Sequence, residues 1–266
     1  MTLRDPSHRD QSGTVWGIGS SHSISHDALD LEPGLGQKPL HGALEEVTDH
    51  FRGVECAQGK IESEPQRTLK QMETVGRTFR SFTAQFSQRK YTAILKEFDT
   101  AETGEFYYAR AKDGSALLRQ EAVSPGRKIL TVKGDKAVFY QPDIKHAQIA
   151  DLGNYRNLAE YLAIGIGQSP AKLEENFAIS YQGTESINGA PCSVLMLKPK
   201  AAKVASRFLG ITLWIKKSSG LPIQNRLTEP SGDYTLLTFS GEKLNVKIPD
   251  SKFEQKLSKD VSIQKY

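Results

Sequence analysis

The sequence predicts a mainly β fold in which helices cover one side of a strongly curved antiparallel sheet. Two observations predict it. Short β-forming segments recur along the chain and are separated by tight turns such as 112–114, 188–189 and 218–220. Stretches with helical spacing interrupt this series, and the apolar face of a sheet must be buried against another layer. We therefore expect about ten strands and about three helices.

The composition sets limits on the function. A chain of 266 residues is long enough for a core that encloses a ligand. Its 35 basic and 31 acidic side chains are mixed along the sequence, with a net charge of +4, which argues against a nucleic-acid partner. Two cysteines, Cys56 and Cys192, leave one disulfide possible and form no CxxC pair.

The first 63 residues differ from the rest. Residues 1–63 are rich in Gly, Ser, His, Asp and Pro without a sustained period, which predicts a disordered arm ahead of one domain over residues 64–266. The His22/His26 spacing suggests a metal site, but histidines in such an arm lack ordered flanking structure. We expect no metal site. No run of apolar residues reaches the length of a membrane span, and residues 1–30 lack the pattern of a secretory signal.

The domain is predicted to open with a helix followed by a strand. Leu69, Met72, Val75 and Phe79 recur at steps of three and four residues, which is typical of an amphipathic helix. The period then changes to two at Phe82, Ala84 and Phe86. Further β segments are expected at 91–98, 104–111, 115–122, 128–133, 136–141, 178–185, 192–198, 211–216, 221–229 and 234–240.

Two more helices are predicted in the middle of the domain. Leu158, Tyr161, Leu162 and Ile166 lie at helical spacing, which predicts a helix over 154–167. Ser169-Pro170 is typical of a capped helix start. The segment 193–197 is apolar on both faces, which indicates either a ligand or partner layer on the second face or a plain two-layer core.

Several motifs resemble one family. Residues 79–88 resemble a helix followed by an S-F-x-A-x-F-x-Q strand, and 104–110 resemble a strand with Gly, aromatics and an arginine. Residues 124–142 resemble a hairpin in which a proline is followed by the pattern D-G-K-x-x-W-x-Y-x-P. Residues 213–253 resemble the end of the family's sequence, which closes with the pattern N-x-x-I-x-x-x-x-F. Over about residues 65–264 the chain resembles LolA-type outer-membrane lipoprotein carriers and lipoprotein-sorting proteins.

The resemblance implies an eleven-stranded half-open barrel with three helices as a lid over an apolar cavity. It implies a monomeric periplasmic carrier without a cofactor, whose partners are lipoproteins or other acylated lipids, an inner-membrane release transporter and an outer-membrane acceptor. Each acyl CH₂ removed from water gains about 0.8 kcal/mol, so such a cavity must be large and dry. Because that family is exported, residues 1–63 lie upstream of the true start, or the chain uses another export route or is not periplasmic.

Arg110 is the candidate lid latch. It matches an arginine that in the family hydrogen-bonds the lid backbone and holds the empty carrier closed, and its five N–H donors suit that role. Here Ala111-Lys112-Asp113-Gly114 follows, where the family has a proline. The alternative is a solvated strand arginine.

The candidate cavity residues are apolar. Leu118 corresponds, counting back from Pro125, to an apolar residue near the family's cavity mouth. Phe82, Phe86, Leu162 and Ile166 are candidate cavity or lid residues from periodicity alone, and ordinary core positions explain all five equally well.

A catalytic function is disfavoured. The domain contains one histidine, His146, and one cysteine, Cys192, with no GxSxG, HExxH or glycine-rich phosphate motif. The main alternative to a carrier is an envelope lipid- or glycolipid-binding protein or a stress sensor of the same fold. With one domain and no appended module, the carrier is favoured.

Overall fold

The computed structural model describes residues 62–152 and 162–266. The predicted arm up to residue 61, and residues 154–161 of the predicted middle helix, lie outside the described residues.

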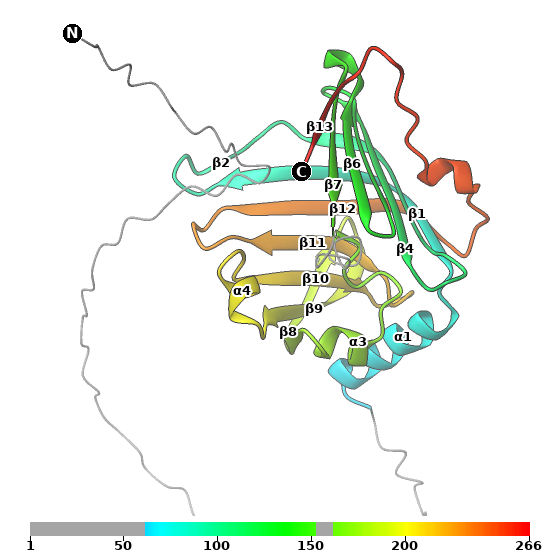
Figure 1. Cartoon of the computed structure of the whole chain (residues 1–266). Helices are drawn as coiled ribbons and strands as arrows, with labels where there is room; N and C mark the ends of the chain where they lie inside the picture. Colours follow the sequence, from blue (N-terminus) through cyan, green and yellow to red (C-terminus); the bar gives the residue numbers. More distant parts are fainter. Residues whose placement is uncertain (1–61, 153–161) are drawn as a thin grey trace, which may run out of the picture. The chain divides into compact units, whose positions relative to one another are not determined.

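The described residues form one sheet of thirteen strands that does not close on itself, which confirms the mainly β, half-open architecture. The order is β13-β7-β6-β5-β4-β3-β1-β12-β11-β10-β9-β8, with β2 paired to β1. All pairs are antiparallel except β13 with β7. In Figure 1, β9 to β12 run across the view while β4 to β7 stand nearly upright, so the sheet is strongly curved. The strands are β1 (Ser81–Thr92), β2 (Glu97–Phe98), β3 (Glu102–Arg110), β4 (Ala116–Ser124), β5 (Lys128–Lys133), β6 (Lys136–Gln141), β7 (His146–Asp151), β8 (Phe177–Ile187), β9 (Ala190–Pro199), β10 (Gly210–Lys216), β11 (Pro222–Thr228), β12 (Tyr234–Leu244) and β13 (Ser262–Lys265).

Helix α1 (Glu64–Thr78) confirms the predicted first helix. Gln66 Oε1 accepts a hydrogen bond of 3.0 Å from the Ser63 backbone N–H, which caps the first turn. Met72 on its apolar stripe is fully buried. Thr68 Oγ1 donates to Ser193 Oγ at 2.7 Å and ties the helix to β9 (Figure 1). The helix therefore covers the β8–β10 end of the sheet.

The second capped helix is also present, as α3 (Pro170–Glu174), where Ser169 Oγ accepts from the Lys172 backbone N–H at 3.3 Å. The prediction of helix over 163–167 is wrong, because these residues form turns. Gly165 and Gly167 adopt φ values of 81° and 64°, and left-handed residues interrupt a right-handed helix. The short helices α4 (Ala202–Ala205), η1 (Pro142–Ile144) and η3 (Asp250–Phe253) complete the described elements.

The strand prediction differs from the structure in two places. The segment 91–98 is a hairpin and not one strand, because β1 ends at Thr92, the chain turns with Lys96 at φ 55°, and β2 pairs back on β1. Strands β7 and β13 are absent from the prediction. Both lack the alternation of bulky apolar residues that marks the other strands, because β7 reads HAQIAD and β13 reads SIQK, with one isoleucine each.

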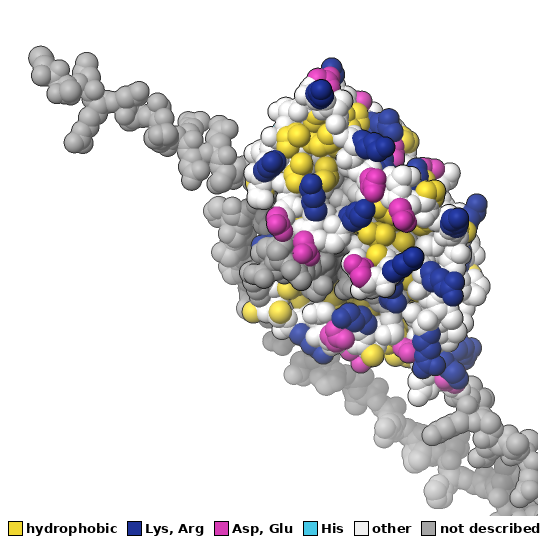
Figure 2. Space-filling model, turned by 45° about the vertical axis from the view of Figure 1, so that its right-hand side comes forward, with side chains coloured by type: hydrophobic (Ala, Val, Ile, Leu, Met, Phe, Trp, Pro, Cys, Tyr) yellow, Lys and Arg dark blue, Asp and Glu magenta, His cyan; other side chains and the backbone are white. Residues whose placement is uncertain are grey.

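The surface carries both signs of charge. Figure 2 shows Lys and Arg side chains interspersed with Asp and Glu over one face of the molecule. In the part of the chain that the structure describes, no helix is long and apolar enough to cross a membrane.

Candidate functional site

The helix-covered face of the sheet is lined by aromatic side chains. Phe82 on β1 meets Phe239 on β12 at 5.5 Å and Phe106 on β3 at 6.2 Å between ring centroids, both edge to face. Phe106 and Phe239 are 5.1 Å apart. The register explains the arrangement, because Phe86 lies opposite Phe239 and Ala84 opposite Phe106, so alternate residues of three strands share one face. We call this group the aromatic interior: Phe79, Phe82, Phe86, Phe106, Tyr108 and Phe239.

The five predicted cavity residues come together in this region. Phe82, Phe86, Leu118 and Ile166 are buried members of one apolar cluster, and Leu162 packs against it. Leu118 on β4 lies between Tyr108 on β3 and Val132 on β5. Phe106 and Phe239 were not among the predicted cavity residues, although their alternation with polar neighbours is typical of strand residues that face a core.

The segment 162–169, which we call the buried connection, lies over this cluster. Ala163, Ile164 and Ile166 are almost fully buried. Hydrogen bonds hold its backbone in place. Within the segment, the Gly165 N–H donates to Gln168 Oε1 at 2.9 Å. From β11 of the sheet, Asn225 Nδ2 donates to the Ile164 carbonyl at 3.5 Å. The buried connection therefore covers the aromatic interior as one layer.

Arg110 joins the end of β3 to the buried connection. Its Nη2 donates a hydrogen bond of 2.6 Å to the Gly167 carbonyl oxygen. Its Cζ lies 5.4 Å from the centroid of the Phe79 ring. Gly167 is required here, because a Cβ at this position would lie 2.1 Å from the same ring. The partner Gly167 was not predicted, since no pattern in the sequence links residues 57 positions apart.

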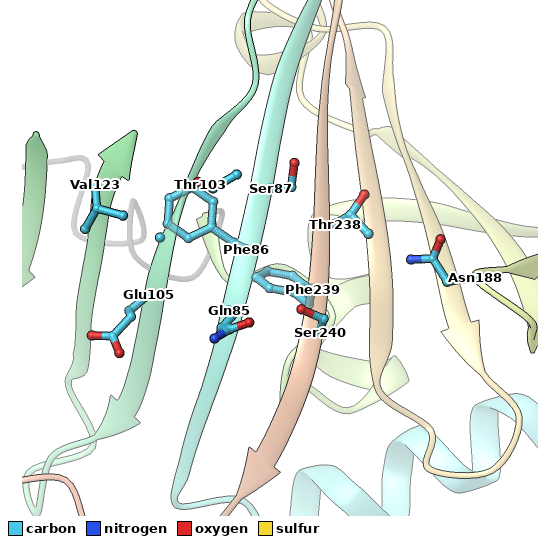
Figure 3. A pocket seen from close by; sticks show the side chains of 11 residues that line it. Gln85, Phe86, Ser87, Thr103, Glu105, Val123, Asn188, Thr238, Phe239 and Ser240 are labelled. Atoms are coloured by element: carbon cyan, nitrogen blue, oxygen red, sulfur yellow. The ribbon is translucent and has the colours of Figure 1, made fainter. Parts of the chain in front are cut away.

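The opposite face of the sheet carries a pocket of about 450 Å³ with both polar and apolar lining residues, which we call the mixed pocket (Figure 3). Gln85 lies opposite both Glu105 and Ser240, and Ser87 opposite both Thr103 and Thr238, so these side chains share the face away from the aromatic interior. Sequence analysis did not predict this pocket. Its lining is Gln85, Phe86, Ser87, Thr103, Gly104, Glu105, Val123, Asn188, Thr238, Phe239 and Ser240. Phe86 and Phe239 of the aromatic interior thus also border this pocket.

The two residues considered for catalysis do not meet. His146 begins β7 near one edge of the sheet, and Cys192 lies on β9 near the other. Cys192 Sγ is buried and donates to the Ala190 carbonyl at 3.3 Å. Burial raises the pKa of this thiol, which disfavours the reactive thiolate. Among residues 62–152 and 162–266, no group of three His, Cys, Asp or Glu is placed to hold a metal ion.

Comparison with protein families identifies the fold. The family model described as outer membrane lipoprotein carrier protein LolA matches residues 77–256. The chain belongs to the LolA family. The LolA match extends from the end of α1 to beyond η3 and includes the aromatic interior, Arg110 and Gly167. LolA-family proteins are binding and carrier proteins, typically of the periplasm.

The solved structures that resemble the chain are distant in sequence, and no curated protein matches it. A crystal structure of MucB is 16% identical with a TM-score of 0.44, and the match covers 71% of this chain and 62% of MucB. An uncharacterized conserved protein from Thermus thermophilus is 12% identical with a TM-score of 0.48, covering 77% of this chain and 100% of that protein. The Mycobacterium tuberculosis lipoprotein LppX is 16% identical with a TM-score of 0.42, covering 70% of this chain and 100% of LppX.

Proposed function

We propose that this LolA-family protein is a non-catalytic periplasmic carrier. It binds the acyl chains of lipoproteins against the aromatic interior and transfers them towards the outer membrane. The observation that carries the proposal is the hydrogen bond from Arg110 to the Gly167 carbonyl, which fastens the buried connection over a large apolar cluster. A fastening that a ligand can break is what a carrier needs in order to load and unload.

The energies favour loading. Burying a 16-carbon acyl chain gains roughly 12 kcal/mol, at about 0.8 kcal/mol for each CH₂. Breaking one hydrogen bond to a charged group costs about 1.5–3 kcal/mol, and less at an exposed group such as Arg110. Moving Leu162 and Ile166 off the cluster costs a further 1.5–3 kcal/mol or so for each side chain. The apolar gain therefore exceeds the cost of opening the buried connection, and the entropy of association, about 4–15 kcal/mol, reduces the net affinity.

The partners follow from this role. The cargo is a lipoprotein or another acylated lipid, received from an inner-membrane release transporter and passed to an outer-membrane acceptor. No covalent step is required, and the separation of His146 from Cys192 gives no nucleophile and base pair for one.

A second candidate is an envelope lipid- or glycolipid-binding protein or a stress sensor. The mixed pocket favours it, because Gln85, Ser87 and Thr238 offer hydrogen-bonding groups for hydroxyls beside the apolar surface of Val123, a combination that suits a glycolipid. A ligand in that pocket would leave the aromatic interior closed.

Titration of the purified full chain with cis-parinaric acid, a fluorescent 18-carbon fatty acid, tests the proposal. We expect saturable binding that Leu118→Glu abolishes, because a carboxylate would face the cluster. Gln182→Glu adds the same charge at an exposed position of β8 and is the matched control. Leu118→Met keeps the site apolar, should retain binding, and shows whether position 118 tolerates change.

Equal binding by wild type and a folded Leu118→Glu chain would contradict the proposal. So would the absence of saturable binding by the wild type. Circular dichroism spectra establish that each variant is folded.

A further inference from the structure

The β1–β2 hairpin presents two large apolar side chains to solvent. Ile94 is 88% exposed and Leu95 is 63% exposed, at adjacent positions of the turn. Isolated exposed apolar residues are common, but two bulky ones at one tip mark a candidate interaction site.

The tip stands on a packed base. Tyr91 stacks on Tyr234 at 4.7 Å, and Phe98 meets both rings edge to face at 5.2 and 5.7 Å. The Ala93 backbone N–H donates to Asp233 Oδ1 at 2.8 Å. These contacts fix the base of the hairpin against β12, and its apolar tip stays exposed instead of packing on the sheet.

A third exposed apolar residue, Leu209, lies along the same edge. The register places Tyr91, Tyr234, Thr228 and Gly210 in one row across β1, β12, β11 and β10. Leu209, which is 56% exposed, comes directly before Gly210. Three strand spacings of about 4.8 Å separate β1 from β10, or roughly 14 Å. Figure 1 shows the β1–β2 turn and the α4 connection at the same ends of these strands.

The charge of this edge is positive. The segment 198–209 contains Lys198, Lys200, Lys203 and Arg207 and no acidic residue, and Lys96 follows Leu95 in the tip. The intervening turn carries two acids: Glu229 pairs with Lys90 at 3.1 Å, whereas Asp233 accepts from the Ala93 N–H and keeps its negative charge. Glu97 adds a second negative charge directly after Lys96. The five basic residues outnumber these two acids, so the edge remains positive. Segments 93–96 and 198–209 together are the loop edge.

We propose that the loop edge docks on the surface of an anionic phospholipid bilayer. Ile94, Leu95 and Leu209 enter the interface, and the basic side chains lie over the headgroups. Apolar side chains that lie apart from one another can each insert into a bilayer if they reach the same depth. A stable protein interface instead requires a continuous apolar core. The polar turn between the two anchors interrupts any such core. This docking does not depend on acyl binding in the aromatic interior.

Vesicle flotation of the full chain tests this inference. Vesicles of phosphatidylcholine with about 30% phosphatidylglycerol are compared with phosphatidylcholine alone. We expect the wild type to bind the anionic vesicles more tightly. Ile94→Ser with Leu95→Ser should weaken that binding about tenfold or more. Ile144→Ser removes a residue of similar exposure, 66%, from η1, outside both the loop edge and the pocket lining, and should have no effect.

The charge contribution is tested separately. Lys96→Glu with Lys198→Glu should weaken binding to anionic vesicles at least about fivefold for each reversal, and raised salt should reduce wild-type binding. The inference is overturned if the wild type binds neither vesicle, or if the double serine variant binds as well as the wild type. Self-association that the serine variant loses, without vesicle binding, would assign the edge to a second copy instead. Parinaric acid titration of the serine variant should be unchanged, which separates this test from that of the carrier.

Discussion

The Arg110 guanidinium donates a hydrogen bond of 2.6 Å to the carbonyl oxygen of Gly167, 57 residues further along the chain. One partner lies at the end of strand β3 and the other in the buried connection, which covers the aromatic interior. The bond thus joins the sheet to its cover at a position open to solvent, where it can break without moving a charge into the core.

Replacing Arg110 should make acyl binding tighter. In Arg110→Ala the ligand no longer has to break the bond to Gly167, and at about 1 kcal/mol for an exposed charged donor the parinaric acid affinity should rise about fivefold. Arg80→Ala, at an exposed arginine next to β1, is the control and should leave the affinity unchanged. Weaker binding by Arg110→Ala would instead mean that Arg110 contacts the ligand.

Gly167→Ala should destabilise the fold more than Gly114→Ala. Both glycines adopt positive φ, at 64° and 83°, so both substitutions carry a backbone cost of about 1 kcal/mol. Only at Gly167 would the new Cβ meet another group, the Phe79 ring at 2.1 Å, whereas Gly114 faces open space. Urea unfolding should show a further loss of about 1–3 kcal/mol for Gly167→Ala. Equal losses at the two positions would show that the buried connection can shift.

Phe239→Ala should be among the most destabilising changes in the sheet. Phe239 is fully buried and its ring contacts Phe82 and Phe106. Truncating such a ring typically costs about 3–5 kcal/mol of unfolding free energy. Leu236→Ala on the opposite face of β12 is the comparison and should cost less than half as much. The midpoints of urea unfolding, compared at an unchanged m-value, measure both losses of unfolding free energy.

Acid should weaken the fold in part through Glu121. Burial alone would raise the pKa of this carboxyl, but hydrogen bonds from Arg127 at 2.5 Å and Arg119 at 2.8 Å outweigh it and hold the pKa below its usual 4.5. A lowered pKa contributes stability that is present above pH 4.5 and is lost as the pH falls through the lowered value. Glu121→Gln should therefore be less stable at neutral pH, by about 2 kcal/mol, and lose less stability on acidification. Parallel acid profiles would exclude this role.

Much of the fold could be predicted because its signals are local. The stripe of Leu69, Met72 and Val75 predicted α1, and the alternation at Phe82, Ala84 and Phe86 predicted β1. The sequence did not predict a strand where only pairing with a distant strand stabilises it. β13 has no buried residue, and it is a strand because its backbone pairs with β7.

The site was predictable only in part. Periodicity selected Phe82, Phe86 and Ile166, but over 163–167 the predicted helix is absent, and Gly165 and Gly167 form turns there. The resemblance to the family pointed to Arg110 and not to its partner Gly167. The two residues are 57 positions apart, and residue spacing in the sequence does not predict a contact over that distance. The mixed pocket depends on the register of β1 with β3 and β12, which no local pattern encodes.

The central claim is that an acyl chain binds in the aromatic interior. Irradiation of the full chain with a palmitic acid that carries a diazirine near its methyl end, followed by mass spectrometry of the labelled peptides, tests it most directly. Labels on Phe82, Phe106, Tyr108 or Leu118, which belong to the apolar cluster and do not line the pocket of the opposite face, are the predicted result when excess unlabelled palmitic acid removes them. Labels confined to Ser87, Thr103 and Thr238 on the opposite face, or labelling that excess palmitic acid does not reduce, would contradict the account.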